Sequence, residues 1–324
     1  MTGPPPAGRA AAPAPRPGAP AAPDGLCVTE YTDPMCPWAW GSEPVFRRLR
    51  ALLAGRAAWR RVYGILFDTD DDPAPDPAAE TAWYERFVHE VSAHTGAPHP
   101  VRLARVAATS WPSALVAKAA EAQGEPVADR VLRRLRESMF AAGEPADTLE
   151  LALAAARGVP DLDPGRLAAD AASAGVLEAV RADHRETRAP LPEVLAVDAP
   201  GPHPGSAKET PAGALRYALP TVVVTGPGGR RVVPGRRPLE AYLAAVAAVA
   251  PAVRPVDQRP SPEGLLAYHR SLTAPEWNLL APGAQPPPEA VPVGTGNGPL
   301  WLHPAEAATS PLPLVPLPYH ADQR

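Results

Sequence analysis

The sequence predicts a mixed α/β fold in which two β-rich segments share one sheet and a block of helices is inserted between them. Three observations support this prediction. Residues 26–67 read as strand, helix and strand, residues 78–188 show only helical periodicity, and residues 219–250 return to two strands and a helix. Strands that are far apart in sequence can pair in one sheet, and a connection between them tolerates an inserted domain.

The first β-rich segment begins with LCVTEYT, whose alternation and β-branched residues predict a strand at 26–32. A helix is expected over 44–53, because Val45, Phe46 and Leu49 have amphipathic spacing and Gly55 follows as a stop signal. WRRVYGILF (59–67) predicts a second strand. The acidic DTDDD (68–72) is interpreted as part of a solvated loop rather than a cation site.

The middle of the chain predicts six helices, at 78–95, 111–123, 126–142, 146–157, 163–173 and 175–188. Within the third of these, the basic run RVLRRLR (130–136) is interpreted as a solvated face. A proline- and glycine-rich loop is expected at 190–213.

The second β-rich segment contains LPTVVVTG, then GPGG and RRVVPG, which together predict a β-hairpin. GPGG lacks the lysine and helix of a phosphate-binding loop, so a turn is the better interpretation. A helix at 236–250 closes the unit, with Pro238 near its first turn.

These elements divide the chain into five parts. They are a disordered Pro/Ala-rich tail (1–25), the first half of the α/β domain (26–77), the helical insertion (78–189), the second half of the domain (190–251) and a C-terminal extension (252–324). Within the extension, EGLLAYHRSL (263–272) and APEWNLLA (274–281) predict two short helices.

The composition limits which partners and which cellular location are expected for the protein. The net charge of −4 gives no global attraction to nucleic acid or anionic membranes, so neither is expected as a partner. The tail, broken by proline, does not resemble a signal peptide, and the apolar run 239–250 is too short to span a bilayer. Two cysteines do not make a secreted disulfide framework. A cytoplasmic protein is expected.

The segment DPMCPWAWGSEP (33–44) carries the candidate chemistry. Cys36 lies between the first strand and the first helix, and Pro37 suits the first helical position. A helix N-terminus favours an anion and typically lowers a cysteine pKa, so Cys36 is the candidate nucleophile. Ala39 stands where a second cysteine would resolve a mixed disulfide, which leaves a monothiol site. Cys27, inside the strand, is interpreted as a buried structural residue.

Other residues besides Cys36 are candidates for the site. Pro220 in ALPTVVV opens a strand either as an ordinary trans proline or as a cis proline. Trp38, Trp40 and Trp111 are candidates for the wall of a binding groove, Trp38 above all. His89, His94 and His99 would lie about 140° apart on a helix and so share no face, and no metal site is expected.

Taken together, these segments resemble the DsbA family of thioredoxin-fold proteins. DPMCPW, SEPVFRRL, SWPSALVAKAAEAQG, RLRESMFAAGE and PTVVV also resemble, in this order, segments of the FrnE-like and SpxH/YjbH-type adaptor subgroup. The resemblance covers roughly 26–250. It implies a thioredoxin fold with a helical insertion and a cis proline at Pro220. It also implies a small, winged-helix-like C-terminal region that has Trp301 near its end.

The resemblance also assigns roles. It implies that Cys36 is the nucleophile, that Pro37, Trp38 and Ala39 complete its motif, and that Leu219, Pro220 and Thr221 line the substrate groove, with Trp111 as a further lining candidate. We therefore expect a thiol-disulfide oxidoreductase or isomerase that acts on a protein or a low-molecular-weight thiol, with no tightly bound cofactor. The alternatives are a non-enzymatic adaptor that delivers a client protein to a ClpXP-type protease, and an isomerase that uses a thiol cofactor on small molecules.

Overall fold

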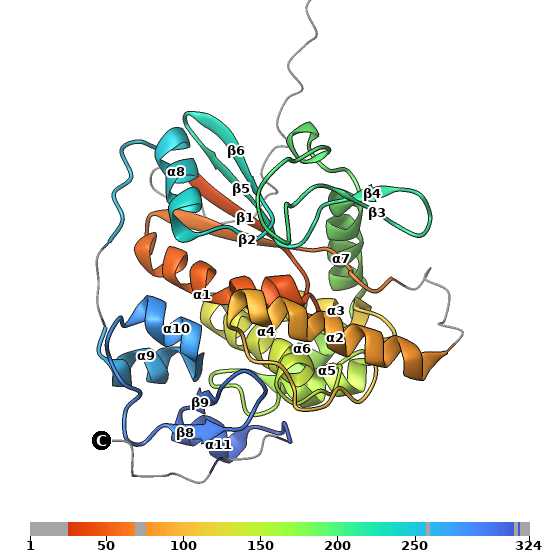
Figure 1. Ribbon diagram of the computed structural model, residues 1–324, viewed down its shortest axis with the longest axis vertical. Coiled ribbons are helices and arrows are strands. Elements are labelled where there is room, and N and C mark those ends of the chain that lie inside the picture. The colour runs from red at the N-terminus through yellow and green to blue at the C-terminus, as the bar shows by residue number, and fades with distance from the viewer. Residues whose placement is uncertain (1–24, 69–75, 257–259, 314–316, 318–324) are drawn as a thin grey trace, which may run out of the picture.

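The computed structural model describes residues 25–68, 76–256, 260–313 and 317. The predicted disordered tail lies almost wholly outside the described residues, as does most of the acidic loop. The central sheet has the strand order β2-β1-β5-β6 and joins the two β-rich segments, as predicted (Figure 1). Strand β1 (Leu26–Thr32) is parallel to β2 (Ala57–Tyr63), while β5 (Thr221–Gly226) is antiparallel both to β1 and to β6 (Gly229–Pro234).

Two helices cover one face of this sheet, α1 (Pro37–Leu52) and α8 (Leu239–Val249). Alternate strand residues such as Val28 and Val222 pack against Phe46 of α1 and Tyr242 of α8. Helix α1 begins at Pro37, as the Cys-Pro pair indicates, rather than at residue 44. Pro44 lies inside the helix, where it forfeits the bond to the carbonyl of residue 40 without ending the helix.

The second predicted strand is shorter than expected. It ends at Tyr63, because Ile65 has a φ of 48°, which breaks the extended backbone. The chain then turns toward the helical insertion.

The insertion confirms the six predicted helices. They are α2 (Pro77–Thr95), α3 (Trp111–Ala120) with the 3₁₀ turn Glu121–Gln123, α4 (Glu125–Phe140), α5 (Leu149–Ala155), α6 (Pro164–Ala171) and α7 (Ala174–Thr187). In Figure 1, α2 to α6 lie below the sheet and α7 stands beside it, against β2. Side chains of Asp76, Thr148, Asp163 and Ser173 cap four of them by accepting backbone N–H bonds, so the sequence defines these boundaries locally.

The segment expected as a loop at 190–213 contains short regular elements. A 3₁₀ turn spans Pro192–Val194, and β3 (Lys208–Glu209) pairs with β4 (Leu215–Arg216). Two-residue strands are too short to give an alternating pattern, so the sequence carried no signal for them.

The C-terminal extension contains the two predicted helices, α9 (Pro262–His269) and α10 (Ala274–Leu280), and further elements that were not predicted. A small antiparallel sheet, in the order β7-β9-β8, is built from Ser271–Thr273, Leu300–Leu302 and Val291–Val293, and α11 (Pro304–Thr309) follows it. Trp301 lies in the central strand. The extension packs beside α1 and α4, where its elements are drawn in blue in Figure 1.

The interpretation of residues 130–136 as a solvated face is wrong. Arg133, Arg134 and Arg136 are each no more than 3% exposed. Arg133 pairs with Glu276 in α10, Arg134 with Glu306 in α11, and Arg136 with Glu43 in α1. The run is buried because α4 lies between α1 and the C-terminal extension, and carboxylates from both neutralise it.

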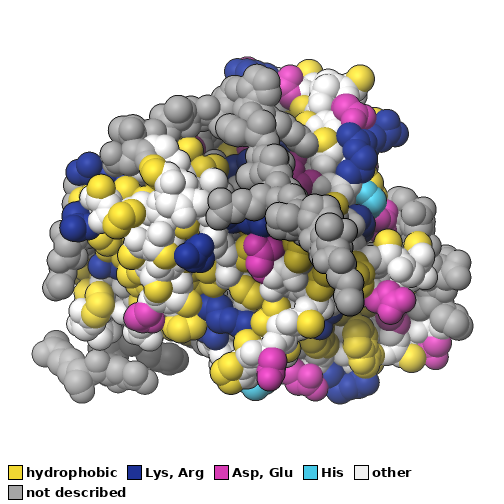
Figure 2. All heavy atoms as spheres, turned by 90° about the horizontal axis from the view of Figure 1, so that it is seen from above, with side chains coloured by type: hydrophobic (Ala, Val, Ile, Leu, Met, Phe, Trp, Pro, Cys, Tyr) yellow, Lys and Arg dark blue, Asp and Glu magenta, His cyan; other side chains and the backbone are white. Residues whose placement is uncertain are grey.

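Two surface properties bear on partners. Within the described ranges, no helix is long and apolar enough to cross a membrane. On the face seen in Figure 2, the basic and acidic side chains of the described residues are interspersed rather than segregated into one charged field.

Candidate functional site

Cys36 is the N-cap of α1, at the junction between β1 and the helix. The residue has an extended backbone (φ −89°, ψ 116°), and Pro37 takes the first helical position, where its missing N–H costs nothing. The Cys36 thiol donates a hydrogen bond to the carbonyl of Leu219 at 3.5 Å. The side chain is buried, with 3% of its surface exposed.

The Leu219 carbonyl belongs to the segment that enters β5. The Leu219–Pro220 peptide bond is cis. Thr221 then begins the strand, paired with Tyr31 of β1, and its hydroxyl donates to the carbonyl of Ala218 at 2.7 Å. Pairing with β1 therefore carries this segment to the end of the sheet from which Cys36 leaves, and residues 36 and 219–221 meet although they are about 180 positions apart in sequence.

Gly64 leaves room for the Leu219 side chain. A Cβ at Gly64 would lie 2.6 Å from Leu219 Cδ1, well inside van der Waals contact. Because Gly64 has no Cβ, the Leu219 side chain can pack directly against the backbone that follows β2.

The remaining motif residues pack in the same cluster. Trp38 and Ala39 are buried beside Cys36 and Leu219, and Ala39 is fully buried. The Trp38 ring stacks with two imidazoles, with centroids 4.9 Å from His203 and 6.3 Å from His94. Trp40 points away, since its indole donates to the carbonyl of Pro98 at 2.8 Å.

The expectation of an activated thiolate at Cys36 is wrong for this arrangement. Burial, together with a smaller effect of the nearby carboxyl of Asp33, raises the pKa of the Cys36 thiol to about 11. The backbone N–H groups of Ala39 and Trp38 oppose this shift, as expected at a helix N-terminus, but desolvation outweighs them. The thiol is protonated at neutral pH, which agrees with its role as a donor to Leu219.

Asp33 is a further ionisable group of the site. One carboxylate oxygen accepts from the N–H of Met35 at 2.8 Å and the other from the N–H of Leu66 at 2.9 Å. Burial raises the pKa of Asp33 despite these bonds. Asp33 thus ties the turn before α1 to the chain after β2.

His203 is the site residue that sequence reasoning missed. Besides stacking on Trp38, its Nε2 lies 2.9 Å from the Leu219 carbonyl that also accepts from Cys36. Burial lowers the pKa of His203 to about 4, so the ring is neutral and donates through Nε2–H. A single histidine in a proline-rich loop carries almost no sequence signal for a functional site. The only such signal is that His203 precedes the ALPT segment in the chain.

Trp111, expected in the groove, lies at the start of α3 and packs against the helical core. Its indole donates to Asp68 at 3.0 Å, and Asp68 also accepts from Arg188 and contacts His184. The cluster around Cys36 does not include it.

Two smaller expectations also need correction. Cys27 is half-buried rather than buried, because it alternates with Leu26 and Val28 and so lies on the face of β1 opposite to α1 and α8. His89 and His99 were expected on different faces of one helix. That helix ends at Thr95, so the chain turns back and brings the two rings to 3.9 Å between centroids. Among the described residues, no group of three or more potential ligands could hold a metal ion.

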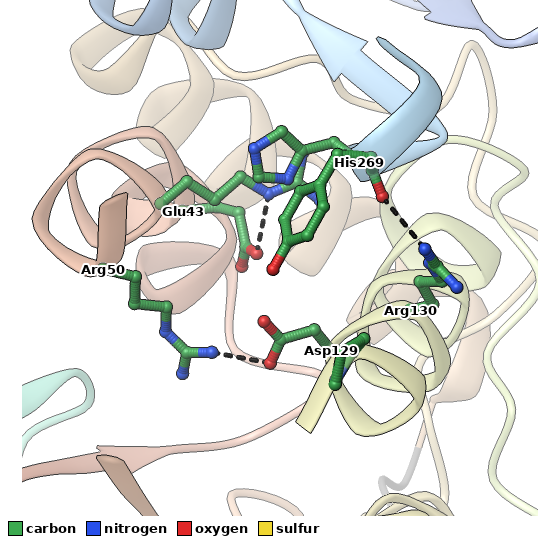
Figure 3. A pocket seen from close by; sticks show the side chains of 8 residues that line it. Glu43, Arg50, Asp129, Arg130 and His269 are labelled. Atoms are coloured by element: carbon green, nitrogen blue, oxygen red, sulfur yellow. Dashed lines mark hydrogen bonds and ion pairs between the residues drawn. The ribbon is translucent and has the colours of Figure 1, made fainter. Parts of the chain in front are cut away.

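A separate small cavity lies between α1, α4 and α9 (Figure 3). It is lined by charged and aromatic side chains, among them Glu43, Arg50, Asp129, Arg130 and His269. Each labelled arginine is paired, Arg50 with Asp129 at 2.6 Å and Arg130 with the carbonyl of Tyr268. The cavity is therefore part of the contact between the extension and the helices rather than of the Cys36 cluster.

Comparison with known proteins agrees with this fold. A family model described as thioredoxin matches residues 30–189. The chain has a thioredoxin fold, with helices inserted between the two halves of its sheet and an extension after the second half.

Solved structures with a similar fold include three that are relevant here. A protein described as a disulfide isomerase from Nitrosomonas europaea is 16% identical, with a TM-score of 0.53, and the match covers 68% of this chain and 95% of that one. A DsbA-type oxidoreductase from Streptomyces coelicolor is 18% identical (TM-score 0.48; coverage 72% and 93%). The cytosolic disulfide reductase DsbM from Pseudomonas aeruginosa is also 18% identical (TM-score 0.46; coverage 64% and 88%). No curated protein matches the sequence.

Proposed function

We propose that this chain is a DsbA-like thiol-disulfide exchange protein in which Cys36 is the single nucleophile. The observation that carries the proposal is the contact between Cys36 Sγ, at the N-terminus of α1, and the Leu219 carbonyl, which precedes the cis Pro220. Leu219, Pro220 and Thr221 would present backbone to the partner, and Trp38 would form one wall. Trp111 could contribute only if the partner extended as far as Asp68.

The chemistry follows from the presence of one thiol. Once exposed, Cys36 loses its proton to solvent, and its thiolate attacks a disulfide R–S–S–R′. The S–S bond breaks as Cys36–S–S–R forms, and R′ leaves as a thiolate. Because Ala39 supplies no second thiol, an external thiolate R″–S⁻ must attack the sulfur of R. This forms R–S–S–R″ and returns Cys36 as a thiolate, with no net oxidation.

The partners proposed here are a protein disulfide and a low-molecular-weight thiol, without a tightly bound cofactor. A cytoplasmic location would supply such a thiol as the releasing agent. The same monothiol chemistry is compatible with a thiol-dependent isomerase of small molecules, for which the described residues give no specific support.

The test is to trap the mixed disulfide. The protein is incubated with glutathione disulfide or with a peptide disulfide, and the adduct is measured by intact mass. Cys27→Ser should retain the adduct and Cys36→Ser should lose it. An adduct that depends on Cys27, or none with either probe under partly denaturing conditions that expose Cys36, would contradict the proposal.

A second candidate function is that of a protein adaptor. It is favoured by the low exposure of Cys36 and by the firmly attached C-terminal extension, which offers a surface without redox chemistry. The two candidates differ in their dependence on sulfur. In a pull-down from lysate, an adaptor would retain its client and its association with a ClpXP-type protease after Cys36→Ser, whereas an exchange protein would lose its disulfide-linked partner.

A further inference from the structure

A short segment of the chain itself covers the candidate site. Residues 203–206 are called the lid below, and the first of them, His203, lies against Trp38 and the Leu219 carbonyl. The His203 ring is nearly parallel to that of Trp38, with an interplanar angle of 18°, and its side chain is only 8% exposed. The lid therefore occupies the side of Cys36 bounded by the motif tryptophan and the cis-proline segment.

The contacts of the lid are those that a bound polypeptide would make. His203 Nε2 donates to the carbonyl of Leu219 at 2.9 Å. The guanidinium of Arg237 donates to two successive lid carbonyls, that of His203 at 3.1 Å and that of Pro204. A side-chain ring, a donor and consecutive backbone carbonyls are groups that an extended peptide can offer to the same partners.

The lid fits closely because of a glycine. Gly205 has a φ of 91°, and a Cβ there would lie 2.4 Å from the carbonyl carbon of Pro234. Another residue would push the lid off the sheet edge. The lid is thus shaped to seat against the strand that precedes Arg237.

The attachment is polar, which makes it replaceable. A partner peptide could take over two kinds of hydrogen bond at little net cost, with a donor for the Leu219 carbonyl and two carbonyls for Arg237. Ser206, at the end of the lid, is held separately, because its hydroxyl bonds to the backbone of Val197. The Cys36 thiol donates to the same Leu219 carbonyl as His203 and is almost without exposed surface in this arrangement.

From these contacts we propose that the lid is an internal occupant of the partner-binding position, and that an extended segment of a partner protein must displace it before Cys36 reacts. His203 is then a gating residue whose ring and N–H hold the place of the partner on Trp38 and Leu219. This inference rests on the proposed role of Cys36, and its test is read out separately from disulfide exchange.

The experiment measures the rate at which iodoacetamide alkylates Cys36 in the folded protein, by intact mass, in a Cys27→Ser background. His203→Ala should raise the rate at least tenfold. The matched control is His94→Ala, since His94 also stacks on Trp38 but is not hydrogen-bonded to Leu219. The control should stay within twofold of the parent.

Arg237→Gln loosens the lid in a second, independent way, because it removes the guanidinium that donates to the carbonyls of His203 and Pro204. It leaves the Trp38 and Leu219 contacts intact and should raise the rate several-fold. If His203→Ala does not fold cooperatively, the Arg237 variant decides the question, since a parent-like rate there overturns the proposal. An equal rise in the His94 variant also overturns it, because the effect would then be general loosening around Trp38.

The same variants separate the two proposals. Mixed disulfide that forms equally well in the parent and in both lid variants, with unchanged alkylation rates, overturns the lid and leaves the exchange function. Faster alkylation in the lid variants without any mixed disulfide supports the lid and overturns the exchange function.

Discussion

Arg133 of α4 donates two hydrogen bonds to Glu276 of α10, at 2.9 and 3.1 Å, and both side chains are almost completely buried. Arg47 of α1 adds a third interaction with the same carboxylate at 3.1 Å. Glu276 thus pairs with two arginines, which Glu137 and Glu43 also contact, and joins the C-terminal extension to both α1 and the helical insertion.

Removing this carboxylate should be costly. Glu276→Gln leaves two guanidinium groups buried with reduced compensation, and we expect a loss of about 3–5 kcal/mol in the free energy of unfolding. Urea denaturation measures it. The control is Glu178→Gln, which breaks an exposed pair with Arg185 and should cost less than about 1 kcal/mol. Similar losses in the two variants would refute the importance of the buried pair.

His269, which lines the cavity in Figure 3, should make the stability depend on pH. Burial, followed by the charge of Arg47, lowers its pKa from 6.5 to about 3. Because the pKa is lower in the folded state, the unfolded chain takes up the proton first, so stability decreases as the pH falls from about 6.5 toward 3. The slope reaches about 1.4 kcal/mol per pH unit for one histidine.

The measurement compares the parent with His269→Gln by urea denaturation at several pH values. The difference in unfolding free energy should be constant above pH 7. Below pH 6.5 it should shift in favour of the variant, which has no proton to take up. A difference that does not change with pH would show that His269 does not contribute.

Cys36 should react in a strongly pH-dependent way. With the pKa raised to about 11, the thiolate fraction increases about tenfold per pH unit between pH 7 and 9. The iodoacetamide rate in the Cys27→Ser background should therefore rise without a plateau over this range. A plateau below pH 8.5 would mean that the thiol is activated after all.

Restoring a second cysteine should change the outcome of exchange. Ala39→Cys places a thiol one helical turn from Cys36, close enough to resolve a mixed disulfide. The adduct with glutathione should then be short-lived and give way to an internal disulfide, detected by mass before and after reduction. Ala39→Ser is the size-matched control and should keep the adduct. A persistent adduct in the cysteine variant would show that residue 39 cannot reach the sulfur.

The local elements of the fold were predictable because their signals are local. Periodicity and caps defined the helices from residue 77 to 187, and the alternating segments defined the strands of the main sheet. The burial of Arg133 and Arg136 was not predictable, since a charged helix face reads as solvated unless its partners are known, and Glu276 is 143 positions away from Arg133. The three-residue strands of the extension are too short for any pattern.

The candidate site was predictable in part for the same reason. The position of Cys36 before a helix follows from its neighbours in sequence. Its high pKa does not, because desolvation depends on what covers the thiol. His203 reaches the site only through the path of the segment after α7, which composition does not reveal.

The covered thiol has a consequence for the chemical durability of the protein. Oxidation of cysteine to sulfenic and then sulfinic acid requires an accessible thiolate. Cys36 is protonated and almost without exposed surface while His203 and Leu219 hold their contacts. Peroxide should therefore damage this sulfur slowly in the resting molecule, so that the only thiol in the motif stays reduced until a partner is bound.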